Sequence, residues 1–129
     1  MPHFIVEYTD NLKEEGDLRG LLKKINDVLI SRPDLFPIGG IRSRAIELNE
    51  YVIADDTEDD AFVHAQLKIG GGRSKEDKAM ISEKIFETME THFASLFEKR
   101  YLALSFELQE FGEGGTYKKN NIHPRYKKT

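Results

Sequence analysis

The sequence predicts an α/β fold in which tandem β-α-β units form a four-stranded sheet with two helices on one face. The prediction rests on two segments with helical periodicity, on strand-like segments either side of each, and on glycine or proline where the pattern changes. Parallel strands joined through a helix need long, right-handed crossovers. We expect residues 1–129 to form one domain, with a pseudo-repeat over residues 2–50 and 61–110.

The first unit begins with a strand at residues 4–8. Asp17 is placed to cap a helix that Pro33 ends, and Gly39-Gly40 then turns the chain into a strand at residues 41–48. Spacings of three and four give this helix one apolar face, made of Leu18, Leu21, Leu22, Ile25, Val28 and Leu29.

The second unit repeats this pattern after an acidic connector at residues 55–60. Residues 61–69 are typical of a strand, three glycines follow, and Ser74 with Asp77 forms a helix-capping signature. A strand at residues 101–110 closes the unit. The long helix between them has a broad apolar face that we expect in the core, made of Met80, Ile81, Ile85, Met89, Phe93, Leu96 and Phe97.

Composition narrows the class of protein. No run of about 18 apolar residues exists, so we expect no membrane-spanning helix. The chain has no cysteine and a start unlike a signal peptide, which favours a cytoplasmic protein. A basic tail at residues 117–129 carries five positive charges and no acid, so a net charge of −4 leaves −9 on the rest. Because that acidic body would repel phosphates, we expect no nucleic-acid partner and interpret the tail as a solvated or partner-docking end.

Two helices on one side leave the other sheet face uncovered. The strand sequences do not alternate cleanly, so this face is expected to be partly apolar. An apolar face of this size needs a partner, which predicts a homo-oligomer, most simply a closed ring.

Pro2 is a candidate general base. A small second residue normally allows removal of Met1, which would leave Pro2 as a free secondary amine at the start of a strand. An α-amino group titrates near neutral pH, where a general base is most useful. The alternative is that a proline at this position has no function.

Three arginines are candidate anion-binding residues. Arg42 and Arg44 share one face of their strand, because side chains alternate with a period of two. Arg73 precedes a helix start, where backbone N–H groups favour a carboxylate. Alternatively, Arg42 and Arg44 could form salt bridges with Glu47 or the connector at the edge of the sheet. The alternative for Arg73 is a solvated loop residue. Together, a basic amine that transfers a proton and three arginines that bind carboxylates suit a small polycarboxylate substrate.

The remaining polar residues predict less. His3, His64, His92 and His123 lack the spacing of a metal site, and His64 is expected to be a packed, hydrogen-bonded residue. The serines lack the context of a nucleophile.

The sequence resembles the 5-carboxymethyl-2-hydroxymuconate isomerase family of the tautomerase superfamily, which also includes 4-oxalocrotonate tautomerase and macrophage migration inhibitory factor. The likeness runs almost the whole length and is weakest at residues 45–60 and 110–117. The segments that carry it are residues 1–7, 39–44, 62–64, 67–70, 72–74, 91–94, 102–107, 120–121 and 123.

This resemblance implies a trimer, no metal or organic cofactor, and 1,3-allylic keto-enol tautomerisation of 5-carboxymethyl-2-hydroxymuconate in homoprotocatechuate (4-hydroxyphenylacetate) degradation. It implies that Pro2 shuttles the proton, that Arg73 grips a substrate carboxylate, and that either Arg42 or Arg44 engages the reacting end. The alternatives are a tautomerase for another enol or 2-hydroxymuconate, and a non-catalytic oligomer that binds a small ligand. The connector and residues 112–115 depart from the family pattern and are expected to shape the rim of the pocket.

Overall fold

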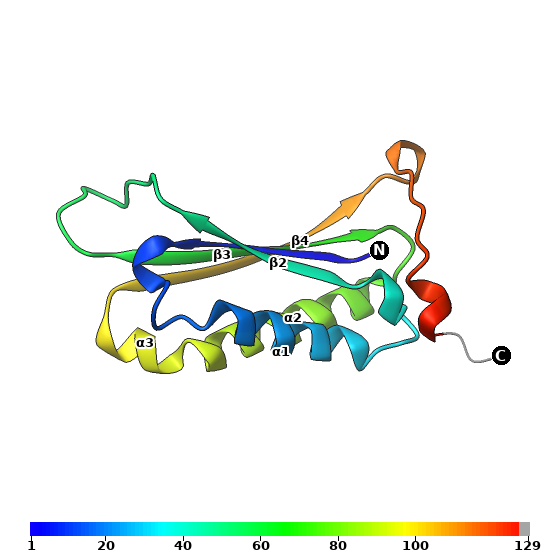
Figure 1. Ribbon diagram of the computed structural model, residues 1–129, viewed down its shortest axis with the longest axis horizontal. Helices are drawn as coiled ribbons and strands as arrows, with labels where there is room; N and C mark the ends of the chain where they lie inside the picture. The colour runs from blue at the N-terminus through cyan, green and yellow to red at the C-terminus, as the bar shows by residue number, and fades with distance from the viewer. Residues whose placement is uncertain (127–129) are drawn as a thin grey trace.

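A four-stranded sheet lies over one layer of helices (Figure 1). The computed structural model describes residues 1–126. The elements follow one another as β1 (His3–Thr9), α1 (Leu18–Ile30), β2 (Arg42–Leu48), β3 (Ala61–Gly70), α2 (Lys75–His92), α3 (Ala94–Lys99) and β4 (Leu102–Phe111). The predicted fold class, a four-stranded α/β sheet with its helices on one face, is confirmed.

The strand order in the sheet is β2-β1-β3-β4. The pairs β1 with β2 and β3 with β4 are parallel, and the central pair, β1 with β3, is antiparallel. As a result β1 and β2 start at the same end of the sheet at which β3 and β4 finish. We call this the Pro2 end, because His3 stands opposite both Arg42 and Lys68 there.

Both predicted helix caps are present. The side chain of Asp17 accepts a hydrogen bond from the Gly20 N–H at 3.1 Å, and the Ser74 hydroxyl accepts one from the Asp77 N–H at 3.0 Å. These bonds satisfy backbone donors that a helix start leaves unpaired. Among residues 1–126, no helix combines the length and the apolar character needed to cross a membrane.

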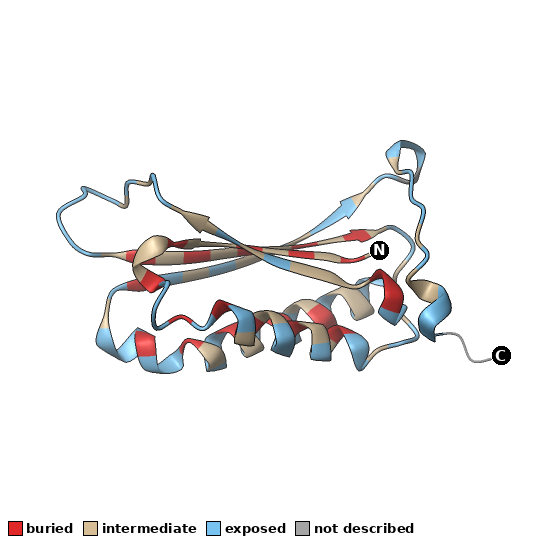
Figure 2. Cartoon of the chain, in the orientation of Figure 1, coloured by how far each residue is buried: buried red, intermediate tan, exposed pale blue. Residues whose placement is uncertain are grey.

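The core lies between the sheet and the helices, where most of the buried residues are found (Figure 2). On the apolar face of the long predicted helix, two residues expected in the core are not fully buried: Met80 is half-buried and Phe97 is 50% exposed. The long predicted helix breaks at Phe93, whose backbone φ and ψ are −99° and 10°. Because α3 starts a new helical register, Phe93 and Leu96 are buried and Phe97 points outward.

The uncovered face of the sheet carries both polar and apolar side chains. The register places on it the polar residues His3, Glu7, Arg42, Arg44, His64, Gln66, Lys68, Ser105, Glu107 and Gln109, and the apolar residues Ile5, Ile46, Leu48, Phe62, Ala103 and Phe111. The strands alternate, with most of their apolar side chains toward the helices. The open face nevertheless keeps apolar side chains among its polar ones, which agrees with the expectation of a partly apolar face.

Candidate active site

The candidate site residues meet at the Pro2 end because of the strand directions. The chain terminus precedes β1, Arg42 begins β2, and Arg73 follows the last residue of β3. Since β3 runs antiparallel to β1, its end lies beside the start of β1. Residues far apart in the sequence thus surround the amino terminus.

Pro2 is buried, and its carbonyl accepts a hydrogen bond from the Arg42 backbone N–H at 3.0 Å. The preceding amino group, on Met1, has a pKa below its ordinary value. Burial is the main cause, followed by the positive charges of Lys118, Arg73 and Arg42. Both effects disfavour the protonated form of an amine. The surroundings of the terminus therefore favour a neutral, basic nitrogen.

Arg42 and Arg44 share a face of β2, as predicted, but they differ in their neighbours. Arg42 donates from Nη1 to the carbonyl oxygen of Gly39 at 3.1 Å, and its charge acts on the terminal amine. Arg44 is more exposed and lies opposite Ile5, with its Nη1 3.2 Å from Nδ1 of His3. Burial and the charge of Arg44 are the two largest causes that lower the pKa of His3.

Glu47 does not pair with these arginines. Its carboxylate lies 3.7 Å from Nζ of Lys13 and accepts a hydrogen bond from Tyr8. Within residues 1–126, the salt-bridged strand edge considered for Arg42 and Arg44 is absent.

Arg73 is held firmly rather than solvated. Its guanidinium donates to the carbonyls of Gly70 and Leu35 at 2.9 and 2.7 Å, and its central carbon lies 4.9 Å from the ring centroid of Phe36. Burial lowers the pKa of Arg73, and the negative charge of Glu110 opposes this shift. An arginine keeps its charge through such shifts. Its Nε is a buried donor without a hydrogen-bond partner in the described chain.

The C-terminal segment is the part of the site that the residue patterns missed. Residues 117–126 return to the Pro2 end instead of extending into solvent (Figure 1). Asn120 donates to the Gly39 carbonyl at 2.9 Å, and the charge of Lys118 acts on the terminal amine. The one sign in the sequence that this segment belongs to the site was the family resemblance at Asn120 and His123. Lys127 and Lys128 of the predicted tail lie outside the described residues.

His64 belongs to a different cluster, on the open face of the sheet. Its Nδ1 lies 2.6 Å from the Ser105 hydroxyl and its Nε2 lies 3.3 Å from the Glu107 carboxylate. This agrees with the predicted hydrogen-bonded histidine. In residues 1–126, no three His, Cys, Asp or Glu side chains gather as metal ligands would.

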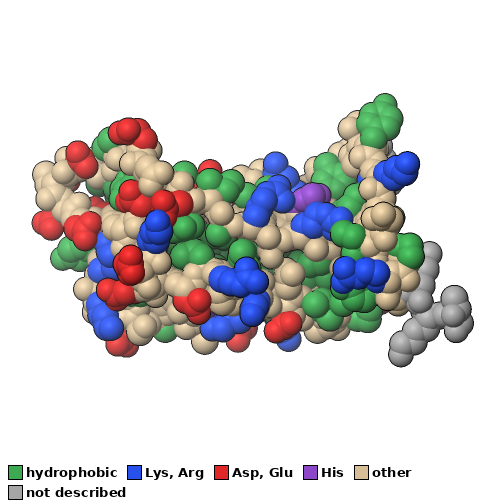
Figure 3. Space-filling model, viewed as in Figure 1, with side chains coloured by type: hydrophobic (Ala, Val, Ile, Leu, Met, Phe, Trp, Pro, Cys, Tyr) green, Lys and Arg blue, Asp and Glu red, His purple; other side chains and the backbone are tan. Residues whose placement is uncertain are grey.

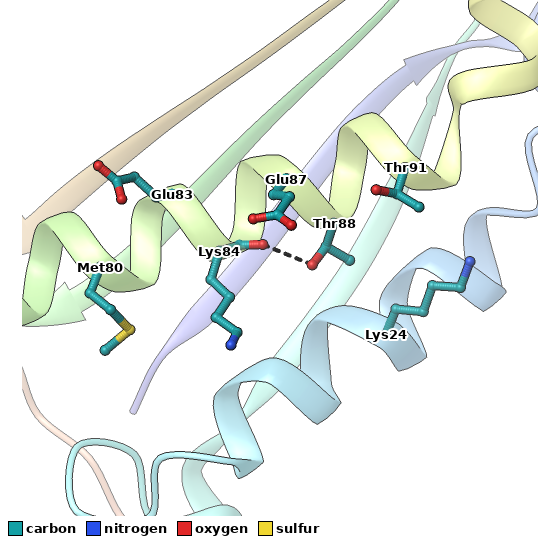
Figure 4. Close-up of a pocket in the computed structure, with 7 residues that line it drawn as sticks. All are labelled: Lys24, Met80, Glu83, Lys84, Glu87, Thr88 and Thr91. Carbon is teal, nitrogen blue, oxygen red and sulfur yellow. Dashed lines mark hydrogen bonds between the residues drawn. The ribbon is translucent and has the colours of Figure 1, made fainter.

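A groove of about 450 Å³ lies between α1 and α2 (Figure 4). Its walls are formed by side chains of the helix layer, which are Lys24, Met80, Glu83, Lys84, Glu87, Thr88 and Thr91. None of the candidate residues lines it. Half-buried Met80 is found here, at the margin of the apolar face.

Charge is unevenly distributed over the molecule. Asp and Glu side chains gather toward the end that carries the connector, whereas Lys and Arg side chains lie nearer the Pro2 end (Figure 3). Within the connector, Asp59 pairs with Arg100 at 3.2 Å. The connector lies at the opposite end of the sheet from the terminus (Figure 1), so within one chain it does not shape a pocket there as expected.

Comparison with known proteins identifies the family. Residues 2–126 match the model of the 5-carboxymethyl-2-hydroxymuconate isomerase family. The chain is 48% identical over 127 residues to a 5-carboxymethyl-2-hydroxymuconate Delta-isomerase of Escherichia coli, with 98% of this chain and all of the relative covered.

Solved structures agree. A 5-carboxymethyl-2-hydroxymuconate isomerase from Deinococcus radiodurans R1 is 54% identical with a TM-score of 0.94, over 98% of this chain and 95% of that one. A second structure, a 5-carboxymethyl-2-hydroxymuconate delta-isomerase, is 26% identical with a TM-score of 0.90, over 100% and 95%.

A more distant structure, described as a fused 4-OT wild type symmetric trimer, has 16% identity and a TM-score of 0.67 over 91% of this chain and 93% of that one, which shows a shared fold alone. Family model, sequence identity and structural likeness agree over nearly the full length, and the chain belongs to the 5-carboxymethyl-2-hydroxymuconate isomerase family.

Proposed function

We propose that Pro2, freed by removal of Met1, is the general base with which this isomerase ketonises 5-carboxymethyl-2-hydroxymuconate. The observation that carries the proposal is the electrostatic setting of the terminus, where burial, Lys118, Arg73 and Arg42 all lower the pKa of the Met1 amino group, whose place the Pro2 amine would take next along the chain. An amine that is neutral at physiological pH can accept a proton, whereas an ammonium cannot.

In the proposed reaction the Pro2 nitrogen takes the proton of the 2-hydroxyl group. The electron pair of that O–H bond forms the carbonyl, and the double bonds shift along the conjugated chain. The protonated nitrogen then returns a proton to the carbon at the far end of the conjugated system. No atom is gained or lost overall, and the proton removed by Pro2 is balanced by the proton that it returns.

Arg42 and Arg73 have complementary roles in this proposal. Arg73 is fixed by two backbone carbonyls, and a fixed guanidinium can hold a substrate carboxylate in one orientation. Arg42, beside Pro2 in the parallel pair, would stabilise negative charge that gathers on the dienolate. Arg44 lies one pleat further along β2 and contacts His3, so we assign it no contact with substrate.

The alternative functions differ in substrate or in chemistry. A tautomerase for another enol or 2-hydroxymuconate would use the same base and differ in which carboxylates it needs. A non-catalytic oligomer would bind a small polycarboxylate without a need for a free Pro2 amine. We place the protein in the cytoplasm and in homoprotocatechuate degradation as parts of the same proposal.

We also propose that the protein works as a homotrimer. The outer edges of β2 and β4 have no strand partner within residues 1–126. Beside β4 lies a groove of about 670 Å³ whose walls include Phe86, Leu104 and Phe106. An unpaired edge with an adjoining apolar groove suits a second copy of the chain, since association pairs the edge and covers the groove.

Replacement of Pro2 by alanine should lower kcat/KM by at least about 10²-fold, since general base catalysis supplies about 10²–10⁴-fold. Ketonisation of 5-carboxymethyl-2-hydroxymuconate, followed by ultraviolet absorbance, measures the loss. Mass spectrometry of both proteins must show that Met1 is absent, because a retained Met1 turns the Pro2 nitrogen into an amide. A loss of only two-fold in fully processed protein would exclude Pro2 as the base.

Arg42→Ala and Arg44→Ala form a matched pair on one strand face. We expect the first to lower kcat/KM by about 10- to 100-fold, the cost of one charge-assisted hydrogen bond, and the second by less than about three-fold. The same absorbance assay applies. Equal losses, or a larger loss for Arg44→Ala, would contradict the assignment.

Light scattering coupled to gel filtration should give a particle of three times the 14.8 kDa chain mass. The mass should stay constant as the protein is diluted through the micromolar range. A monomer that retains full isomerase activity would show that one chain completes the site alone.

A further inference from the structure

The C-terminal segment at residues 117–126, here called the strap, packs against the loop that precedes β2. That loop contains a short 3-10 helix, η2 (Ile38–Gly40), and the strap ends in another, η4 (His123–Tyr126). Figure 1 shows the strap descending from the end of β4 to lie beside η2 and the chain terminus. The strap therefore borders the candidate site.

Two features hold the strap in this position. Asn120 donates from Nδ2 to the Gly39 carbonyl at 2.9 Å and accepts from the Ile122 N–H at 2.6 Å. A Cβ atom added at Gly39 would lie 2.8 Å from Cα and 2.9 Å from the backbone N of His123. These distances are too short for non-bonded atoms. Position 39 must lack a side chain for the strap to lie where it does.

The strap is linked to the catalytic residues through one atom. The carbonyl oxygen of Gly39 accepts from Asn120 of the strap and also from Nη1 of Arg42. The Asn120 amide is also 3.7 Å from the sulfur of Met1, whose Cγ lies 3.3 Å from the position of a Cβ at Gly40. Met1 thus lies between the strap and η2, in space that its removal would open to substrate.

Lys118 supplies the charge. It lies two residues before Asn120, is exposed, and has no carboxylate within salt-bridge distance in the described chain. Among the three cations that act on the terminal amine, its effect is the largest. With those of Arg42 and Arg73, three positive charges therefore act on the terminus.

We propose that Lys118 binds the carboxymethyl group of the substrate and that Asn120 is the positioning residue that holds Lys118 over the site. This inference rests on the proposed function. The substrate carries three carboxylates, two from the muconate chain and one from the carboxymethyl group, and the site offers three cations. The planar forks of Arg42 and Arg73 match the fixed carboxylates of a conjugated chain, whereas a flexible ammonium suits one on a rotatable CH₂.

The test compares two substrates, 5-carboxymethyl-2-hydroxymuconate and 2-hydroxymuconate, which lacks the third carboxylate. Lys118→Met should lower kcat/KM for the tricarboxylate by about 10- to 100-fold, mainly through KM, and for the dicarboxylate by much less. The preference, defined as the ratio of kcat/KM for the tricarboxylate to kcat/KM for the dicarboxylate, should therefore fall at least about ten-fold. If the dicarboxylate is not turned over, its inhibition constant replaces its kcat/KM.

Lys119→Met is the matched control, since Lys119 is an exposed neighbour on the same strap. It should leave the preference within about two-fold of wild type. Equal losses on both substrates for Lys118→Met, or the same fall in preference for Lys119→Met, would overturn the inference. A wild-type protein that ketonises neither substrate would instead contradict the proposed function.

Asn120→Ala tests the positioning role. This change should reduce the same preference. The double variant with Lys118→Met should have the same preference as Lys118→Met alone, because the two changes remove the same interaction. A further, additive fall in preference would show that Asn120 acts independently of Lys118. An unchanged urea midpoint in each variant excludes loss of the fold.

Discussion

The antiparallel pairing of β1 with β3 is the constraint on which the site depends. Each β-α-β unit has parallel strands, so either unit alone would place its strand starts at one end and its strand finishes at the other. Because the central pair is antiparallel, the strands of the second unit run in the opposite direction to those of the first. The start of the first unit, with its terminus and Arg42, then meets the finish of the second, with Arg73 and the strap. The proposed base and the proposed anion-binding residues are brought together by topology.

This convergence also sets the electrostatics. The sheet holds Pro2 in a buried position, and its neighbours at that end are cationic, while the acidic connector lies at the other end. In the proposed function, a polycarboxylate substrate is attracted by the same charges that lower the pKa of the terminal amine. The Gly39 carbonyl, shared by Arg42 and Asn120, links a residue of β2 to the strap. In this proposal, substrate binding and the basicity of Pro2 are two effects of one arrangement.

The sequence predicted what local chemistry determines and missed what depends on long-range pairing. The helix caps at Asp17 and Ser74 and the apolar periodicities were readable because each depends on residues within a few turns. The strand register was not readable, and without it Arg42 could not be separated from Arg44. The strap has no periodicity and is held by hydrogen bonds from Asn120, so the basic residues of the tail suggested a solvated or partner-docking end.

Direct titration of the Pro2 nitrogen in the processed protein, followed by ¹⁵N NMR, tests the central claim most directly. Burial and neighbouring positive charge both lower the pKa of the Met1 amino group. We expect the same surroundings to hold the pKa of the Pro2 nitrogen below the ordinary α-amino range of about 7.7–8.0, so that the base is present above that pKa. Activity should rise with pH through the same value. A nitrogen that titrates within or above the ordinary range would contradict the account, because the terminus would then be mostly protonated at neutral pH.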